Sequence, residues 1–203
     1  MKLMVAIPTL DYVHFNFTRC LIGLTQRLER MGVEYEICFL GGTLVYLGRD
    51  RLASEAVNKG FTHVLWLDAD MVFDPDVFER LLAHHKPFVT GLYASRHAPY
   101  LATVFESLAP ECKTFETVPK EGLFEIEACG FGIVLMESKV ILDVYKHCEL
   151  MFQPFDAHGE DIMFCKRARE TGYTLYCDPT VRAGHIGHVT VWPNVKEIEN
   201  DNA

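Results

Sequence analysis

The sequence lacks three features that would place it in other classes of protein. It has no run of about 18 uncharged apolar residues, the minimum for a membrane-spanning helix. It has no Cys-x-x-Cys pair, and its seven cysteines are scattered, so neither a disulfide framework nor a zinc finger is expected. It also lacks an excess of basic residues. The formal net charge is −9, which disfavours a nucleic-acid partner.

The composition that remains is that of a globular protein. Hydrophobic residues make up 49% and charged residues 23% of 203 residues, enough for one domain with a buried core. We expect a single domain over residues 1–192 and a polar, frayed tail over 193–203. The apolar N-terminus is interrupted by Pro8 and Asp11, which favours a buried first strand over a signal peptide. Several cysteines lie in apolar runs, so we expect a cytoplasmic protein with reduced, mostly buried thiols.

The first half of the chain alternates strands with helices. The patterns predict strands over 2–10, 34–40, 63–67 and 86–93, and helices over 15–31, 49–59 and about 75–84. Asp74 is expected as the N-cap of the third helix and Pro75 in its first turn. The alternation predicts an α/β fold with a mainly parallel sheet flanked by helices.

The second half follows a different pattern. Short β-like pieces over 100–127 indicate a small antiparallel excursion from the main sheet. The remaining elements are expected to be a strand over 131–136, helices over 138–147 and 160–171, and a last strand over 173–177.

Two aspartates follow the most apolar strand. Residues 64–67 read VLWL, which indicates a strand buried on both faces, and Asp68 and Asp70 come directly after it. Alternate residues of an extended chain point the same way, and open α/β sheets bind ligands at the carboxyl ends of their strands. Carboxylate oxygens favour Mn²⁺ or Mg²⁺, which keep positions open for phosphate oxygens. Both aspartates could instead merely end the strand, but Asp74 already serves as the expected cap of the next helix. We therefore predict a site for Mn²⁺ or Mg²⁺ and a diphosphate.

The strand, the D-x-D spacing and the following Asp-Pro pair resemble the GT-A nucleotide-sugar glycosyltransferases, especially the synthase-like inverting group and its short relatives. The resemblance covers most of the chain. The strand ending in Pro8 and Thr9 is similar to the nucleotide-binding start of that family. Residues 47–53, LGRDRLA, resemble a donor-proximal segment often written A-R-N, with Asp50 where Asn is frequent.

The resemblance implies a GT-A-like fold and a UDP- or GDP-sugar donor bound near Pro8, Thr9 and either Arg49 or Arg51. The acceptor would carry a hydroxyl group, on a glycan, a lipid-linked sugar or a small molecule. Gly130 belongs to a small glycine-containing loop that the family places near the sugars. Tight packing at the entry of a strand explains this glycine equally well.

The resemblance also assigns roles in the metal site. In the family, the first carboxylate of D-x-D contacts the ribose or the metal and the second binds the metal, which corresponds to Asp68 and Asp70. A late His in a His-x-Gly context completes the metal or diphosphate site. His185 matches this pattern, with His188 as the alternative.

Glu160 and Asp161 start the helix expected over 160–171. The helix dipole stabilises acidic residues at this position, so the pair alone is equally consistent with a structural role. The family has a Glu-Asp pair here, followed by an aromatic residue and an arginine, which match Phe164 and Arg167. The resemblance implies that Asp161 is the general base of an inverting reaction and that Glu160 positions the acceptor. A retaining enzyme would not need Asp161 as a base.

The expected activity is transfer of a hexose from a nucleotide-diphosphate sugar to a hydroxyl group, dependent on a metal ion. One rival is a sugar-nucleotide nucleotidyltransferase, which usually has a glycine-rich basic loop after the first strand. Here that loop reads PTLDYVHFNF and has no Gly, Lys or Arg before Arg19. The other rival is a non-catalytic nucleotide- or carbohydrate-binding domain, against which the pair Glu160 and Asp161 argues. Arg96, after the fourth strand, is consistent with pairing to phosphate or acceptor and equally with a solvated loop.

Overall fold

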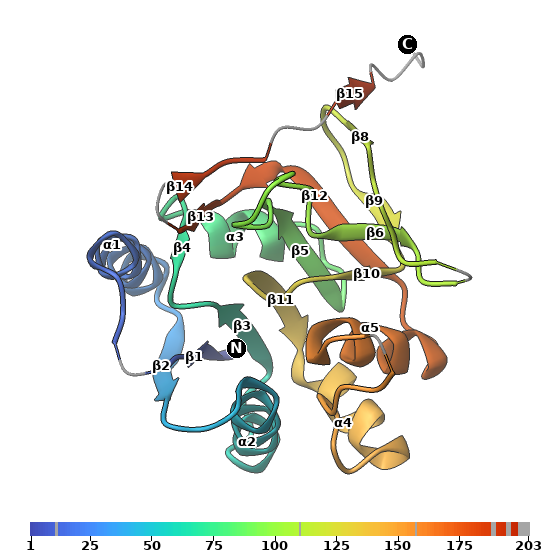
Figure 1. Ribbon diagram of the computed structural model, residues 1–203. Helices are drawn as coiled ribbons and strands as arrows, with labels where there is room; N and C mark the ends of the chain where they lie inside the picture. Colours follow the sequence, from blue (N-terminus) through green and yellow to red (C-terminus); the bar gives the residue numbers. More distant parts are fainter. Residues whose placement is uncertain (11, 110, 157, 188–189, 194–195, 199–203) are drawn as a thin grey trace.

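The computed structural model describes residues 1–10, 12–109, 111–156, 158–187, 190–193 and 196–198 (Figure 1). Its main sheet has seven strands, in the order β2 (Glu34–Leu40), β1 (Lys2–Pro8), β3 (His63–Leu67), β11 (Ile133–Glu137), β5 (Phe88–Leu92), β12 (Leu175–Arg182) and β9 (Phe124–Ile126). Five of these strands run in one direction, while β11 and β9 are antiparallel to their neighbours. The predicted α/β fold with a mainly parallel sheet is confirmed. The antiparallel direction of β11 was not predicted.

Helices cover both faces of this sheet (Figure 1). Helices α1 (Phe15–Met31) and α3 (Val77–Leu82) pack on one face, and α2 (Val45–Asn58), α4 (Ser138–His147) and α5 (Glu160–Glu170) pack on the other. Strand β3 shows how the sequence produces two cores. Leu65 and Leu67 join the cluster under α1 and α3, whereas Val64 and Trp66 join the cluster under α2, α4 and α5. Successive side chains of a strand point to opposite faces, so an all-apolar strand is buried on both.

Three small sheets complete the fold. The first has the order β10 (Ala128–Cys129), β6 (Val104–Ser107) and β7 (Lys113–Thr114), and the second has the order β14 (Thr190–Val191), β13 (Gly184–Ile186) and β4 (Met71–Val72). The third pairs β15 (Lys196–Ile198) with β8 (Thr117–Pro119). The antiparallel pairs of β6 with β7 and of β9 with β12 confirm the excursion predicted for residues 100–127.

Two predicted helix starts were wrong. Helix α2 begins at Val45 instead of Arg49, after Leu44, which makes no side-chain cap. The first turn therefore carries no polar start signal that a sequence pattern could detect. Helix α3 begins at Val77, with Asp76 at the N-cap position instead of Asp74. Pro75 lies in the preceding turn and packs so closely on α1 that a Cβ at Gly23 would lie 2.9 Å from its Cγ.

Two predictions for the end of the chain also need correction. Strand β12 continues beyond Cys177 to Arg182, because a register shift after Asp178 lets the strand pass Pro179. Residues 196–198 of the expected frayed tail form β15, parallel to β8.

No helix in the described part of the chain combines the length and hydropathy that a membrane crossing requires. The seven cysteines are free thiols, and the buried ones are Cys38, Cys129, Cys165 and Cys177.

Candidate active site

A cavity of about 800 Å³ lies at the carboxyl ends of β1, β3 and β5. We refer to it below as the cavity. Its walls also include residues from α2, the start of α5 and strand β13. The structure brings nine of the ten residues predicted for the site to its lining: Pro8, Thr9, Arg49, Asp68, Asp70, Gly130, Glu160, Asp161 and His185.

One of the ten predicted residues is not part of this lining. Arg51 is exposed on α2, where it lines a separate surface hollow together with Ser54 and Glu55. His188, the alternative to His185, lies outside the described residues.

Arg49 is buried at the inner wall of the cavity, with 2% of its surface exposed. Its Nη2 donates to Oδ1 of Asp68 at 2.9 Å, and its Nε donates to Oε1 of Glu160 at 3.4 Å. Its guanidinium carbon lies 5.2 Å from the ring centre of Phe131. The sequence predicted contact with a donor for either Arg49 or Arg51, and in the structure Arg49 links two acidic residues. Its burial could have been predicted, since residues 49, 52, 53 and 56 share one apolar face of α2.

Asp50, which replaces the frequent Asn of the resembled segment, is also buried. Its Oδ1 accepts a hydrogen bond from the backbone N–H of Phe152 at 3.1 Å. Burial raises the pKa of Asp50, and backbone hydrogen bonds from Phe152 and Met151 partly offset that effect. This residue thus anchors the chain segment that leads into α5.

Asp70 and His185 meet because two short strands pair. Strand β13 is antiparallel to β4, which places His185 opposite Met71, next in sequence to Asp70. Nε2 of His185 lies 3.3 Å from Oδ2 of Asp70, and Nη1 of Arg96 donates to the same oxygen at 2.6 Å. Burial raises the pKa of Asp70, but its hydrogen bond with His185 and the charges of His185 and Arg96 outweigh burial and lower it. Burial lowers the pKa of His185, and the contact with Asp70 more than compensates, so that it is raised.

The chemistry of these donors fits a Mn²⁺ or Mg²⁺ ion. Carboxylate oxygens and one imidazole nitrogen are ligands that such ions accept. Nδ1 of His185 lies 3.0 Å from the carbonyl oxygen of Ala94. A proton on Nδ1, donated to that carbonyl, leaves the lone pair of Nε2 free for a metal. The oxygen Oδ1 of Asp68 is occupied by Arg49, so its second oxygen is the one open to an ion.

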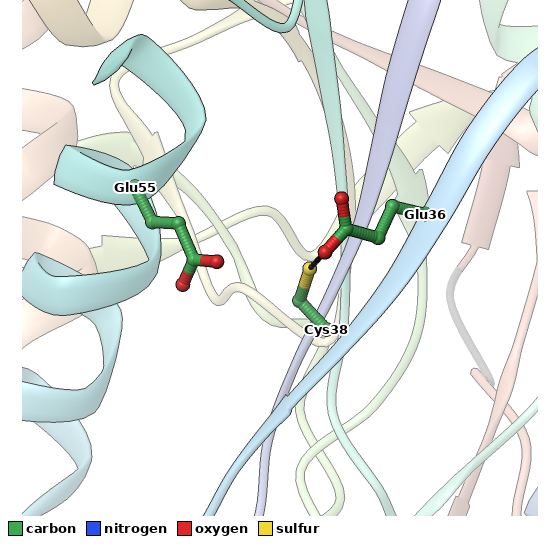
Figure 2. A group of neighbouring side chains, drawn as sticks. All are labelled: Glu36, Cys38 and Glu55. Atoms are coloured by element: carbon green, nitrogen blue, oxygen red, sulfur yellow. Dashed lines mark hydrogen bonds between the residues drawn. The ribbon is translucent and has the colours of Figure 1, made fainter. Parts of the chain in front are cut away.

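Figure 2 shows another group of possible ligands, none of which belongs to the cavity lining. In the part of the chain that the structure describes, Glu36, Cys38 and Glu55 form the one group whose ligand atoms all lie within 4.8 Å of one another. Nζ of Lys59 already pairs with Glu36 at 2.9 Å and with Glu55 at 2.7 Å. Burial and the charges of both glutamates raise the pKa of Cys38 to about 11, which opposes thiolate ligation. We therefore assign no metal to this group.

Asp161 lies in the first turn of α5 and faces the cavity. Its Oδ1 accepts a hydrogen bond from the backbone N–H of Ile162 at 2.8 Å. Burial, together with the charge of Glu160, raises the pKa of Asp161 to about 6, and the charge of Arg49 acts in the opposite direction. A carboxylate of this pKa is ionised at neutral pH and is a stronger base than an ordinary aspartate.

Tyr93 is a buried residue of the site that the sequence reasoning missed. It follows β5 directly, and its Oη accepts a hydrogen bond from the N–H of Gly132 at 3.0 Å. A Cβ at Gly130 would collide with this hydroxyl, and a Cβ at Gly132 would lie 2.8 Å from Cζ of the ring. The close approach that requires these glycines is therefore made by a tyrosine within the protein. The sequence signal was the position of Tyr93 at the carboxyl end of an apolar strand, as for Asp68.

No family model and no curated protein matches this sequence. Solved structures do match its fold. The A197 protein from STIV is similar over 100% of both chains, with a TM-score of 0.60 and 18% identity. A UDP-glucose pyrophosphorylase, solved in complex with UDP-glucose, is similar over 88% of this chain and 89% of its own, with a TM-score of 0.54 and 7% identity. At such identities the likeness establishes a shared fold, and this chain is an α/β protein whose cavity opens at the carboxyl ends of its parallel strands.

Proposed function

We propose that this chain is a metal-dependent glycosyltransferase that uses a nucleotide-sugar donor. The charge of the cavity is the observation that carries the proposal. Four carboxylates, from Asp68, Asp70, Glu160 and Asp161, face two guanidinium groups, from Arg49 and Arg96. A diphosphate is repelled by such an excess of negative charge unless a divalent cation reverses the local field. The shared fold with a pyrophosphorylase that holds UDP-glucose supports a nucleotide sugar as the ligand.

In this proposal Asp70, His185 and the free oxygen of Asp68 would hold Mn²⁺ or Mg²⁺. When bound, the ion supplies positive charge that stabilises the diphosphate as it leaves the sugar. Pro8 and Thr9 line the cavity at the end of β1, on the side of the predicted nucleotide site.

The transfer step itself depends on Asp161 and Glu160. Asp161 accepts the proton of the acceptor hydroxyl while that oxygen bonds to the anomeric carbon. The bond between this carbon and the diphosphate oxygen breaks, and the configuration inverts. Glu160, held by Arg49 at 3.4 Å, has a second oxygen with which to orient the acceptor. A raised pKa suits Asp161 for this role because it makes the carboxylate a better proton acceptor.

The test is an assay of nucleoside diphosphate release from UDP-glucose, UDP-galactose and GDP-mannose, with Mn²⁺ and a panel of hydroxyl acceptors. We expect release with one donor, loss of release on adding EDTA, and recovery when Mn²⁺ is restored. A protein that neither releases nor binds any nucleoside diphosphate in the presence of Mn²⁺ would rule out the proposal.

A nucleotidyltransferase is the second candidate, favoured by the fold shared with a pyrophosphorylase. The lining of the cavity opposes it. Leu10, Tyr12 and His14, from the loop after β1, line the cavity, and the described lining residues include no Lys or Arg from this loop. Incubation with UTP and glucose 1-phosphate distinguishes the two activities, because only the nucleotidyltransferase would release pyrophosphate. Binding of UDP with Mn²⁺ but no turnover with any donor would indicate the non-catalytic alternative.

A further inference from the structure

Arg96 lies on a loop that forms one wall of the cavity. An antiparallel bridge between Ala94 and Ala102 closes the base of this loop, and the N–H of Ser95 donates to the carbonyl oxygen of Leu101 at 2.8 Å. The backbone beside Arg96 is thus fixed, while the side chain remains 50% exposed. Its guanidinium group can therefore move without any rearrangement of the loop.

The present partner of Arg96 is an oxygen that the proposed metal site needs. Oδ2 of Asp70 lies 2.6 Å from Nη1 of Arg96 and 3.3 Å from Nε2 of His185. A divalent cation on Asp70 and a guanidinium on the same oxygen repel each other. An ion pair as exposed as this one contributes little to stability, so its exchange for another partner is easily reversible.

Of the two arginines that line the cavity, Arg96 is the one that can bind an anionic ligand. Arg49 and Arg96 are the Lys or Arg side chains among the described residues that line the cavity. Arg49 is 2% exposed and already bonded to Asp68 and Glu160. An anionic ligand that enters the cavity can therefore recruit Arg96 but not Arg49.

We propose that Arg96 is a diphosphate-binding residue that is held on Asp70 until the metal and nucleotide enter. It then releases Asp70 and pairs with the terminal phosphate of the nucleotide, where a guanidinium can donate two parallel hydrogen bonds. This inference rests on the proposed function and adds to it a residue that couples the two ligands. Because the metal frees Arg96 and Arg96 then binds the phosphate, metal and nucleotide favour each other's binding.

The test compares the wild-type protein with Arg96→Gln and, as a matched control, Arg30→Gln, which removes an exposed arginine at the end of α1. Binding of Mn²⁺ alone is followed by electron paramagnetic resonance. Binding of UDP, GDP and the corresponding monophosphates in the presence of Mn²⁺ is followed by calorimetry. Arg96→Lys is measured in parallel, because it keeps the charge and loses the bidentate geometry.

For Arg96→Gln we expect Mn²⁺ alone to bind about threefold to tenfold more tightly, since Asp70 is no longer occupied. With Mn²⁺ present, the nucleoside diphosphate should bind roughly tenfold more weakly, while the monophosphate changes less than about twofold. A general effect of charge would weaken both nucleotides alike. The affinities of Arg96→Lys for Mn²⁺ and for the diphosphate should lie between those of wild type and Arg96→Gln. The affinities of Arg30→Gln should equal those of wild type.

The outcomes separate this inference from the proposed function. The inference is wrong, and the proposed function stands, if wild type binds diphosphates and Arg96→Gln binds them equally well. The same conclusion follows if Arg96→Gln lowers the affinities for the diphosphate and the monophosphate by the same factor. If wild type binds no nucleotide with Mn²⁺, both are overturned.

Discussion

Arg49 and Asp68 form the innermost ion pair of the cavity, with Nη2 of Arg49 lying 2.9 Å from Oδ1 of Asp68. Arg49 also contacts Glu160, so one buried cation holds the end of β3 against the start of α5. Burial raises the pKa of Asp68, and the charge of Arg49 partly offsets that effect. Arg49 therefore allows two acidic groups with different proposed roles to share one guanidinium.

The first prediction follows from the burial of Arg49. Arg49→Met should lower the free energy of unfolding by about 3 kcal/mol, because it leaves Asp68 and Glu160 without their shared cation. Urea unfolding followed by circular dichroism measures the change. Arg51→Met, two residues along the same helix but exposed, should change stability by less than about 0.5 kcal/mol. Equal losses in the two variants would show that the ion pairs of Arg49 are not what makes this position important.

The second prediction concerns Tyr93 and the two glycines packed on it. Gly130→Ala should cost about 1–3 kcal/mol, because its Cβ would collide with the tyrosine hydroxyl. In a Tyr93→Phe background that collision disappears, so the added cost of Gly130→Ala should fall by at least about 1 kcal/mol. Gly132→Ala is the control. Its Cβ would meet ring carbons of Tyr93, which phenylalanine keeps, so Tyr93→Phe should not rescue it. Unfolding of the single and double variants gives both coupling energies.

The sequence predicted the fold where apolar periodicity is strong. Helix α1 and strands β2 and β3 have the predicted bounds because their apolar residues recur with a single period and turn residues end them. The start of α2 could not be predicted, because Val45 follows Leu44 with no capping side chain. The orientation of β11 depends on its partners β3 and β5, which no local pattern encodes.

The sequence allowed prediction of those site residues that lie at the ends of strands or at the start of a helix. Asp68, Asp70 and the start of α5 converge because these elements end or begin at one edge of the sheet. The pairings inside the site were not predictable. The contact of Arg49 with Glu160 joins residues 111 positions apart, and that of Asp70 with Arg96 joins residues 26 apart. Such contacts depend on packing of the whole chain, and short motifs carry no signal for them.

The third prediction concerns the metal. Asp70→Ala should abolish Mn²⁺-dependent binding of a nucleoside diphosphate, because Asp70 and the neighbouring His185 would both be ligands of the proposed metal site. The fold should persist, since Asp70 lies at the cavity and outside both apolar clusters. Thermal shift with UDP or GDP, with and without Mn²⁺, measures binding, and EDTA should remove the shift of the wild-type protein. An undiminished Mn²⁺-dependent shift in Asp70→Ala would contradict the assignment.

The fourth prediction concerns the proposed role of Asp161 as the general base. Asp161→Asn keeps the shape of the side chain and removes its basicity, so kcat should fall by about 10²–10⁴ while donor affinity stays the same. Because burial raises the pKa of Asp161 to about 6, the wild-type rate should decline as the pH falls below about 6, where the base becomes protonated. At saturating Mn²⁺, which keeps His185 deprotonated, this acidic limb should be absent from the residual activity of the variant. Glu160→Gln should instead weaken acceptor binding more than donor binding. Near wild-type turnover by Asp161→Asn would point to another base or to a retaining mechanism.

The last prediction separates a proposed base from a helix cap through stability. The pKa of Asp161 is raised from 3.8 to about 6 in the folded protein, so the folded state binds this proton more tightly than the unfolded state does. The stability that the neutral carboxyl group contributes is therefore fully present below about pH 4 and is lost as the pH rises through about 6. Asparagine stays neutral throughout.

Near pH 8, the free energy of unfolding of Asp161→Asn should therefore exceed that of wild type by about 1–2 kcal/mol. This value is reduced because the group faces the cavity. Near pH 4 the two proteins should be equally stable. Urea unfolding at both pH values measures the difference, and Glu160→Gln, which loses the contact with Arg49, should show no such gain. A variant less stable than wild type near pH 8 would mean that the carboxylate serves α5 as a cap, since removing its charge would then weaken the helix.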